Sequence, residues 1–224
     1  MGTPIRVLLV DNHAMFAQAV AAALGEQEGL EVVAVAGTAA EGIESARVHM
    51  PDVVLMDYRL PDLLGDEATR AIKRERPETA VVMVTAAEDD EVLGRAVDAG
   101  CSGFVMKQDG LEELLSAVRT AHSGGSVIPP RLLRTLMGRL RNGDEESPGL
   151  TPRESEVLQL LALGGDTRDI ADRLSLSHNT ARNHVQAVLR KLGAHNKLEA
   201  VMTALRLGLI RPPAVAPMGT DPPG

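Results

Sequence analysis

The sequence has few of the residues that build disulfides or aromatic binding sites. It contains one cysteine in 224 residues, which excludes an internal disulfide and any metal or redox motif that needs two cysteines. A single free thiol fits a reducing compartment. Tryptophan is absent, and the aromatic residues are Phe16, Tyr58 and Phe104. An aromatic platform for single-stranded nucleic acid, or an aromatic-lined sugar or cation site, is therefore not expected.

Long apolar runs are also missing. No stretch approaches the ~18 apolar residues of a membrane-spanning helix, and the N-terminal run reaches the charged Asp11 too soon for a signal peptide. Apolar residues make up 44% and charged residues 24%, which is enough to bury a core. We therefore expect a cytoplasmic protein, with one large domain or two modest ones at roughly 150 residues per domain.

Charge is distributed unevenly along the chain. Residues 1–123 hold 10 Lys and Arg against 21 Asp and Glu, a net charge of −11. Residues 150–211 hold 9 against 6, a net charge of +3, although the whole chain carries −8. This split predicts an acidic first half and a second half whose partner is anionic.

The first half alternates short apolar runs with amphipathic stretches of helical length. The runs are apolar on both faces, as expected of parallel strands buried between two helix layers. They occupy Ile5–Val10, Val32–Ala36, Val53–Met56, Ala80–Val84 and Gly103–Met106. Strands that are each followed by a helix predict the α/β class, with a doubly wound, five-stranded parallel sheet in the flavodoxin-like order 2-1-3-4-5.

The pattern changes after residue 123. A leucine stripe at helical spacing (132–140) precedes a polar, turn-forming stretch, and a second, all-α unit follows, beginning at a capping box formed by Thr151 and Glu154. The Pro-rich end has too little apolar surface to fold by itself. The expected division is an α/β domain at 1–123, a linker at 124–149, an all-α domain at 150–211 and a disordered tail at 212–224.

Four polar residues of the α/β domain stand where predicted strands end. Asp11, Asp57, Thr85 and Lys107 follow the first, third, fourth and fifth runs. Order 2-1-3-4-5 makes the first and third strands neighbours, so it brings Asp11 and Asp57 together at the sheet edge where ligands bind. Two close carboxylates call for a cation, and Mg²⁺ commonly binds one or two carboxylates plus a phosphate. Asp57 then becomes a nucleophile for phosphoryl transfer, with Thr85 and Lys107 holding phosphoryl oxygens.

The runs VLLVDNH, VLMDYRLPDLLG, MVTAAED and GFVMK, in this order, resemble the receiver domain of bacterial two-component response regulators over about residues 5–123. The resemblance implies that Asp57 is the phosphoacceptor and that Asp11 and the backbone carbonyl of Arg59 bind the metal. It also implies that Thr85 and Lys107 sense phosphorylation, and that Phe104 is the aromatic residue that turns inward on activation.

One position departs from the family pattern. Asn12 stands where receivers usually carry a second acidic residue that binds the metal directly. An amide oxygen still coordinates Mg²⁺, but one negative charge is missing. We therefore predict weaker Mg²⁺ binding and slower phosphorylation than an Asn12→Asp variant would show. The neighbouring His13 is expected to cap or pack against the following helix.

The all-α unit contains two helices joined by a tight turn. Residues 167–174 and 178–191 are separated by a turn in which Ser177 is placed as a cap, and a further helix is expected at 196–208. This arrangement is typical of a helix-turn-helix, whose second helix enters the DNA major groove. Side chains that suit base edges are Asn179, Arg182, Asn183 and Gln186. Side chains better placed for phosphates are Thr180, Arg190, Lys191 and Lys197. Spacing alone also fits a plain helical bundle with a solvated face.

The run LTPRESEVLQLLALGGDTRDIADRLSLSHNTARNHVQAVLRKLGAHNKLEAV closely resembles the LuxR-type DNA-binding domain of the NarL/FixJ subfamily, and the resemblance covers about residues 150–210. The resemblance implies that the last helix contributes to dimerisation on DNA. His178, His184 and His195 match no usual metal-ligand spacing, so a zinc site is not expected.

These features predict a DNA-binding transcription regulator in which a sensor histidine kinase phosphorylates Asp57 with Mg²⁺, and phosphorylation promotes homodimerisation and promoter binding. One alternative is a regulator that binds DNA without phosphorylation, which Asn12 favours. Another is an enzyme such as an aspartyl phosphatase. That chemistry wants a second acid just after the nucleophile, and Asp57-Tyr58-Arg59 lacks one, so we expect no enzyme.

Overall fold

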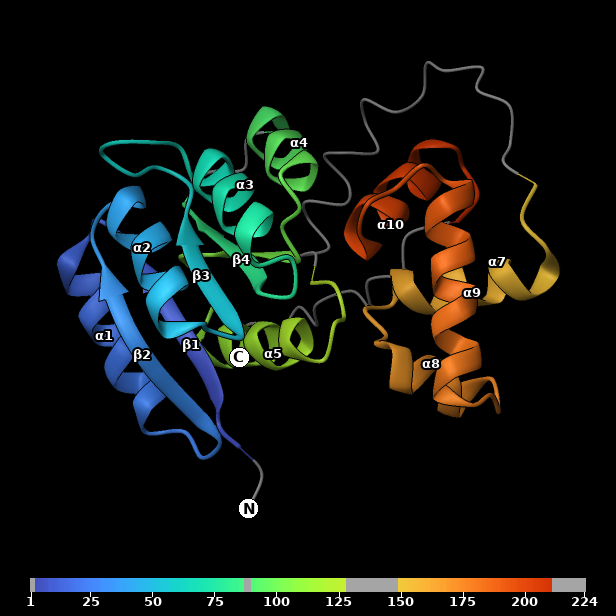
Figure 1. Ribbon diagram of the computed structural model, residues 1–224, viewed down its shortest axis with the longest axis horizontal. Helices are drawn as coiled ribbons and strands as arrows, with labels where there is room; N and C mark the ends of the chain where they lie inside the picture. The colour runs from blue at the N-terminus through green and yellow to red at the C-terminus, as the bar shows by residue number, and fades with distance from the viewer. Residues whose placement is uncertain (1–2, 87–89, 128–148, 211–224) are drawn as a thin grey trace, which may run out of the picture.

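The first domain is built on a parallel sheet covered by helices on both faces. A computed structural model describes residues 3–86, 90–127 and 149–210. The strands run in the order β2-β1-β3-β4-β5, and every pair is parallel, which confirms the predicted topology (Figure 1). Their bounds are β1 (Ile5–Val10), β2 (Leu30–Ala36), β3 (Val53–Asp57), β4 (Ala80–Thr85) and β5 (Gly103–Met106).

Two apolar cores lie on the two faces of this sheet. Every residue of β3, β4 and β5 is buried, because alternate side chains point into opposite helix layers. One core joins the sheet to α1 (Ala14–Gly25) and α5 (Leu111–His122). The other joins it to α2 (Ala39–His49), α3 (Gly65–Glu75) and α4 (Asp90–Asp98).

The strand register sets the place of the polar residues. Val10 pairs with Met56, and Asp57 pairs with Val84, so β1, β3 and β4 end at the same edge. Thr85 pairs with Met106, which brings the end of β5 to this edge too. Residues just past these strand ends therefore converge, as the sequence predicts.

The second domain consists of four helices around one small core. They are α7 (Pro152–Ala162), α8 (Thr167–Arg173), α9 (His178–Lys191) and α10 (Lys197–Arg206). Side chains cap each of them. Thr151 and Glu154 form the predicted capping box of α7, and Ser177 accepts from the Thr180 amide at the start of α9. Asp166 and Asn196 cap α8 and α10 in the same manner.

The first domain extends beyond its predicted end at residue 123. Val127 forms a parallel bridge with Gly103, and its carbonyl accepts from the Phe104 amide at 2.8 Å. Val127, which the sequence assigned to the linker, thus pairs with the edge of β5. The leucine stripe at 132–140 and the tail at 212–224 lie outside the described residues.

The two domains touch through α10 and α4 (Figure 1). Leu198 of α10 is fully buried and belongs to the apolar core of the first domain together with Leu93 of α4. A Cβ added at Gly125 would lie 2.7 Å from the carbonyl oxygen of Gly164, so the two backbones come close here because a glycine is present. Among the helices that the structure describes, none is long and apolar enough to cross a membrane.

Candidate functional site

Two buried carboxylates face each other at the carboxyl edge of the sheet. Asp11 follows β1 and is 2% exposed, and Asp57 ends β3 and is 4% exposed. Each offers an oxygen to a group of candidate ligand atoms that lie within 4.8 Å of one another. The structure thus brings together the pair that the sequence placed on this edge. Because like charges this close repel, the site favours a cation.

Lys107 supplies a positive charge to this pair. Its Nζ lies 2.6 Å from Asp11 Oδ2 and 2.7 Å from Asp57 Oδ2. Its amide donates to the carbonyl of Thr85 at 2.9 Å, which extends the β4–β5 pairing past the strand ends. The ammonium also lies 5.0 Å from the centroid of the Phe16 ring, within the range of a cation–π contact.

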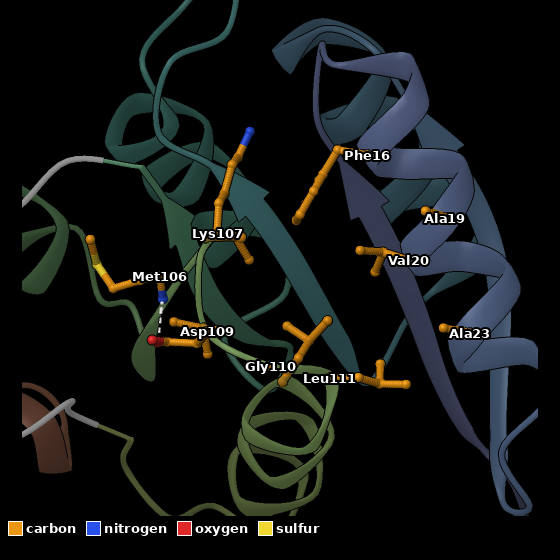
Figure 2. Close-up of a pocket in the computed structure, with 12 residues that line it drawn as sticks. Phe16, Ala19, Val20, Ala23, Met106, Lys107, Asp109, Gly110 and Leu111 are labelled. Carbon is orange, nitrogen blue, oxygen red and sulfur yellow. Dashed lines mark hydrogen bonds between the residues drawn. The ribbon is translucent and has the colours of Figure 1, made fainter. Parts of the chain in front are cut away.

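An apolar pocket of about 210 Å³ opens beside Lys107. Figure 2 shows Phe16 and Val20 of α1 on one side of it and Leu111, at the start of α5, on the other. The dashed line in the figure is the bond from the Met106 amide to Asp109, at 2.9 Å, which holds the turn between β5 and α5. Lys107 therefore lines the apolar pocket and also forms ion pairs with Asp11 and Asp57.

The loop after β3 holds the Asp57 carboxylate in place. The amide of Arg59 donates to Asp57 Oδ1 at 3.3 Å, and the amide of Gly65 donates to the carbonyl of Tyr58 at 2.8 Å. A Cβ at Gly65 would lie 2.5 Å from the carbonyl oxygen of Asp57, so only glycine fits. Asp62 accepts from the first amides of α2, and these backbone bonds lower its pKa. The loop is therefore tied down at both ends.

The other residues that the resemblance singled out lie around this cluster. Thr85 is 4% exposed and ends β4. Phe104 is 2% exposed and packs in the core of the α2–α3–α4 face, so in this structure its ring is turned inward. Asn12, the residue between Asp11 and His13, is exposed.

His13 was wrongly predicted to cap or pack. It is the N-cap residue of α1, but its side chain makes no capping bond and is 64% exposed. Its Nδ1 instead lies 3.1 Å from Asp11 Oδ1, 3.6 Å from Asp57 Oδ2 and 3.2 Å from Lys107 Nζ. The run Asp-Asn-His in the first motif was the available signal, because a residue two positions after Asp11 can turn back over it.

A divalent cation fits the chemistry of this site. Asp11 Oδ2 is buried, and among the described residues no donor reaches it in hydrogen-bond geometry, although Lys107 Nζ is close enough to form an ion pair. Two carboxylates with one ammonium leave a net negative charge. Oxygen donors in this number are what Mg²⁺ commonly uses, with water or phosphate completing the coordination.

The polar face of α9 is exposed. Ala181, Val185, Val188 and Leu189 point into the core of the second domain. The side chains predicted to read base edges all lie on the exposed surface, at Asn179, Arg182, Asn183 and Gln186. Arg190, predicted to contact phosphate, is exposed as well. The helix therefore presents a continuous polar face of the kind that enters a major groove.

Three other residues predicted to contact phosphate are engaged within the protein. Lys191 donates to Glu154 at 2.7 Å and to the carbonyl of Gly149 at 2.9 Å. The hydrogen bond between Lys191 and Glu154 is the main reason why the pKa of Glu154 falls to about 2. Lys197 donates to the carbonyl of Gly124 at 2.5 Å and to Thr167 at 3.1 Å, and burial lowers its pKa. The Thr180 hydroxyl shares a hydrogen bond with Ser177 at 2.8 Å.

Comparison with protein families matches both domains. A family described as response regulator receiver domain matches residues 7–119, and one described as bacterial regulatory proteins, luxR family, matches residues 148–204. The response regulator protein VraR of Staphylococcus epidermidis is 34% identical over 92% of this chain and 99% of its own length. The transcriptional regulatory protein LnrK of Bacillus subtilis is 32% identical over 92% of this chain and 98% of its own.

Solved structures give the same result. The response regulator ChrA of a heme-sensing two-component system is 28% identical over 93% of this chain and all of its own, with a TM-score of 0.52. The response regulator RcsB of Salmonella typhimurium is 26% identical over 89% of this chain and 97% of its own, with a TM-score of 0.56. The sequence and structural comparisons thus agree along nearly the whole chain.

Proposed function

Because this chain belongs to the two-component response regulators that join a receiver to a LuxR-type DNA-binding domain, we propose that a sensor histidine kinase phosphorylates Asp57 and thereby controls promoter binding. One observation carries the proposal. The Asp57 carboxylate is buried beside a second acid and lies 2.7 Å from the ammonium of Lys107, at the edge of the sheet where parallel α/β folds bind ligands.

The transfer is a displacement at phosphorus. A carboxylate oxygen of Asp57 attacks the phosphorus of a phosphohistidine, and the P–N bond breaks with its electron pair left on the imidazole nitrogen. The product is an acyl phosphate on Asp57. The Arg59 amide holds one carboxylate oxygen, and the Lys107 ammonium is close enough to neutralise charge on the incoming phosphoryl oxygens.

Mg²⁺ is the cation we propose for this step. Asp11, Asp57, the amide oxygen of Asn12 and the backbone carbonyl of Arg59 are the groups that would hold it. When bound, it neutralises the two carboxylates and the phosphoryl oxygens, which lets an anion approach an anion. Thr85, at the end of β4, and Lys107 would then hold the transferred group from the opposite side. Phe104 would respond to this rearrangement as the aromatic residue of the switch.

The contact between the domains supports a way for this signal to reach DNA. According to the family resemblance, α10 contributes to dimerisation. In this structure it lies against α4 of the receiver and buries Leu198 there. A receiver rearrangement that loosens this contact would free α10 for a second copy. The homodimer could then place two α9 helices on two half-sites of a promoter. Arg182 and its neighbours would read bases, and Arg190 would contact phosphate.

The decisive test uses a small phosphodonor with Mg²⁺ and the full-length protein. Intact-mass measurement should show the addition of one phosphoryl group in the wild type and in the control Asp98→Asn, which alters an exposed carboxylate on α4. Asp57→Asn should show none. Phosphorylation of the Asp57→Asn variant would refute the assignment.

A second candidate function has one observation in its favour. Asn12 removes a carboxylate from the cation site, which favours a regulator that binds DNA without phosphorylation. Gel-shift titrations separate the two candidates. Phosphorylation-controlled binding predicts that the donor increases the DNA affinity of the wild type and not that of Asp57→Asn. Equal DNA binding by both proteins, with and without donor, supports the phosphorylation-independent function.

A further inference from the structure

We propose that His13 is a nitrogen ligand of the cation site, which makes it a mixed oxygen and nitrogen site that prefers divalent transition ions, of the Co²⁺, Ni²⁺ and Zn²⁺ class, to Mg²⁺. The inference deepens the proposed function, because it concerns the same pocket, and it rests on that pocket being used for a cation. It assigns His13 a role and gives the site a different metal preference.

The ring nitrogen is placed as a ligand would be. His13 Nδ1 lies 3.1 Å from Asp11 Oδ1 and 3.6 Å from Asp57 Oδ2. Donor atoms that share one cation at about 2.1 Å are separated by roughly 3 to 4 Å. The three side chains offer atoms that all lie within 4.8 Å of one another, so small side-chain rotations suffice to bring them around one ion.

The contact with Lys107 shows what occupies the same space. Lys107 Nζ is 3.2 Å from His13 Nδ1, 2.6 Å from Asp11 Oδ2 and 2.7 Å from Asp57 Oδ2. Nδ1 donates to Asp11 Oδ1 only when it carries the ring proton. In the tautomer protonated on Nε2, its lone pair instead accepts from the Lys107 ammonium, which only donates. A metal ion that displaced the ammonium would meet two carboxylates and the same lone pair.

The backbone leaves the ring free to take this position. The His13 amide donates to Asp11 Oδ1 at 2.8 Å, which folds the Asp-Asn-His segment over the carboxylate. His13 occupies the N-cap of α1 in an extended conformation, but its side chain is not used to cap the helix. Nothing in the helix therefore competes with the pocket for Nδ1. Asp11 Oδ2 is buried and, among the described residues, meets Lys107 Nζ as an ion pair but no donor in hydrogen-bond geometry, so a cation that replaced the ammonium would satisfy it.

Asn12 and His13 together change the balance between metals. Mg²⁺ is a hard ion that depends on charged oxygen ligands, and Asn12 supplies a neutral amide where a carboxylate would add charge. Imidazole suits Ni²⁺, Cu²⁺ and Zn²⁺, and affinity for nitrogen sites rises along the series from Mn²⁺ to Cu²⁺. Losing an acid therefore weakens Mg²⁺ binding more than it weakens binding of ions that an imidazole holds.

The test compares metal affinities of the full-length wild type and His13→Ala by calorimetric titration with Mg²⁺ and Ni²⁺. Ni²⁺ affinity should fall about tenfold in His13→Ala, whereas Mg²⁺ affinity should change less than about twofold. His122→Ala, which removes an exposed imidazole at the end of α5, is the matched control and should leave both affinities unchanged. Equal losses for the two metals in His13→Ala would overturn the proposal.

A spectroscopic measurement reports ligation directly. Electron spin-echo modulation of bound Mn²⁺ detects a directly coordinated imidazole nitrogen. The wild type should show this ¹⁴N coupling, and His13→Ala should lose it. Wild-type Mn²⁺ without ¹⁴N coupling would overturn the proposal. Intact-mass phosphorylation of the same samples keeps the two hypotheses apart, because His13→Ala that is still phosphorylated on Asp57 with Mg²⁺ leaves the proposed function standing whatever the metal results are.

Discussion

The two last long helices of the DNA-binding domain differ in what they leave free. α9 exposes the polar side chains that suit base edges, from Asn179 to Gln186. α10 instead lies against the receiver, with Leu198 buried in the receiver core and Lys197 bonded to Gly124. The reading surface is thus open while the helix implicated in dimerisation is covered. Under the proposed function, the receiver would therefore restrain dimerisation on DNA and leave recognition of a single half-site unaffected.

We expect the largest effect on the contact between α10 and the receiver from Leu198→Ala. Replacing a fully buried Leu by Ala costs about 2–5 kcal/mol, and here part of that cost falls on the contact between domains. The unphosphorylated variant should therefore be more extended, with a larger radius of gyration in small-angle X-ray scattering. Leu205→Ala is the control, since Leu205 is buried in the core of its own domain. An unchanged radius for Leu198→Ala would show that α10 is not held there.

Glu154→Gln tests whether Lys191 belongs to the fold rather than to the reading surface. The Lys191 bond lowers the pKa of Glu154 from its usual 4.5 to about 2, so Glu154 stabilises the folded state above pH 4.5. That contribution is lost as the pH falls towards 2. Hydrogen bonds to charged groups contribute about 1.5–3 kcal/mol. Thermal unfolding followed by circular dichroism should show Glu154→Gln less stable at pH 6, with the difference shrinking towards pH 2.5. A difference that does not depend on pH would contradict this role.

Arg182→Ala sharpens the assignment of the α9 face. Arg182 is exposed in the middle of that face, and a bidentate contact from Arg to guanine is worth about 1–3 kcal/mol of discrimination. Gel-shift titration should show weaker binding to the preferred sequence and little change on unrelated DNA. Arg190→Ala should instead weaken binding to all sequences alike and reduce the dependence on salt. Uniform weakening by both variants would mean that the reading face is assigned wrongly.

Lys197→Met should have the smallest effect. Its hydrogen bonds to Gly124 and Thr167 have a charged donor, for which about 1.5–3 kcal/mol is typical, but burial of the ammonium, which lowers its pKa, opposes this gain. The unphosphorylated variant should be cleaved slightly faster by protease near residue 124. Its affinity for a single half-site should not change, because in this conformation Lys197 faces the receiver. A marked loss of half-site affinity would indicate that Lys197 contacts DNA, as the sequence predicted.

Local patterns accounted for most of the fold. Runs of apolar residues predicted all five strands, with β1 and β5 matching at both ends, since a strand buried on both faces must be apolar throughout. The start of α7 followed from Thr151 and Glu154, because a capping box is a contact between residues three apart. The convergence of Asp11 and Asp57 also followed, since parallel strands place their carboxyl ends on one edge.

Contacts between distant parts of the chain were not predictable in this manner. Lys191 and Lys197 were predicted to contact phosphates because they are basic and lie in or near the recognition helix. In the structure, Lys191 is hydrogen-bonded to Glu154, 37 residues away, and Lys197 to Gly124, 73 residues away. Residues 124–127 were predicted to lie in the linker because of their glycines, but Val127 pairs with the edge of β5, and backbone pairing depends little on side chains. In both cases the residues near the contact in the sequence do not indicate which distant residue is the partner.

The amino-acid sequence by itself determined the two domains, the strand order and the acidic pair, because each follows from periodicity, capping or the geometry of parallel strands. Only the tertiary structure decided that the His13 ring turns into the acidic pocket and that α10 rests on α4. Both depend on where side chains from separate elements meet, and the free energy of such contacts is set by packing and charge in three dimensions rather than by the order of neighbouring residues.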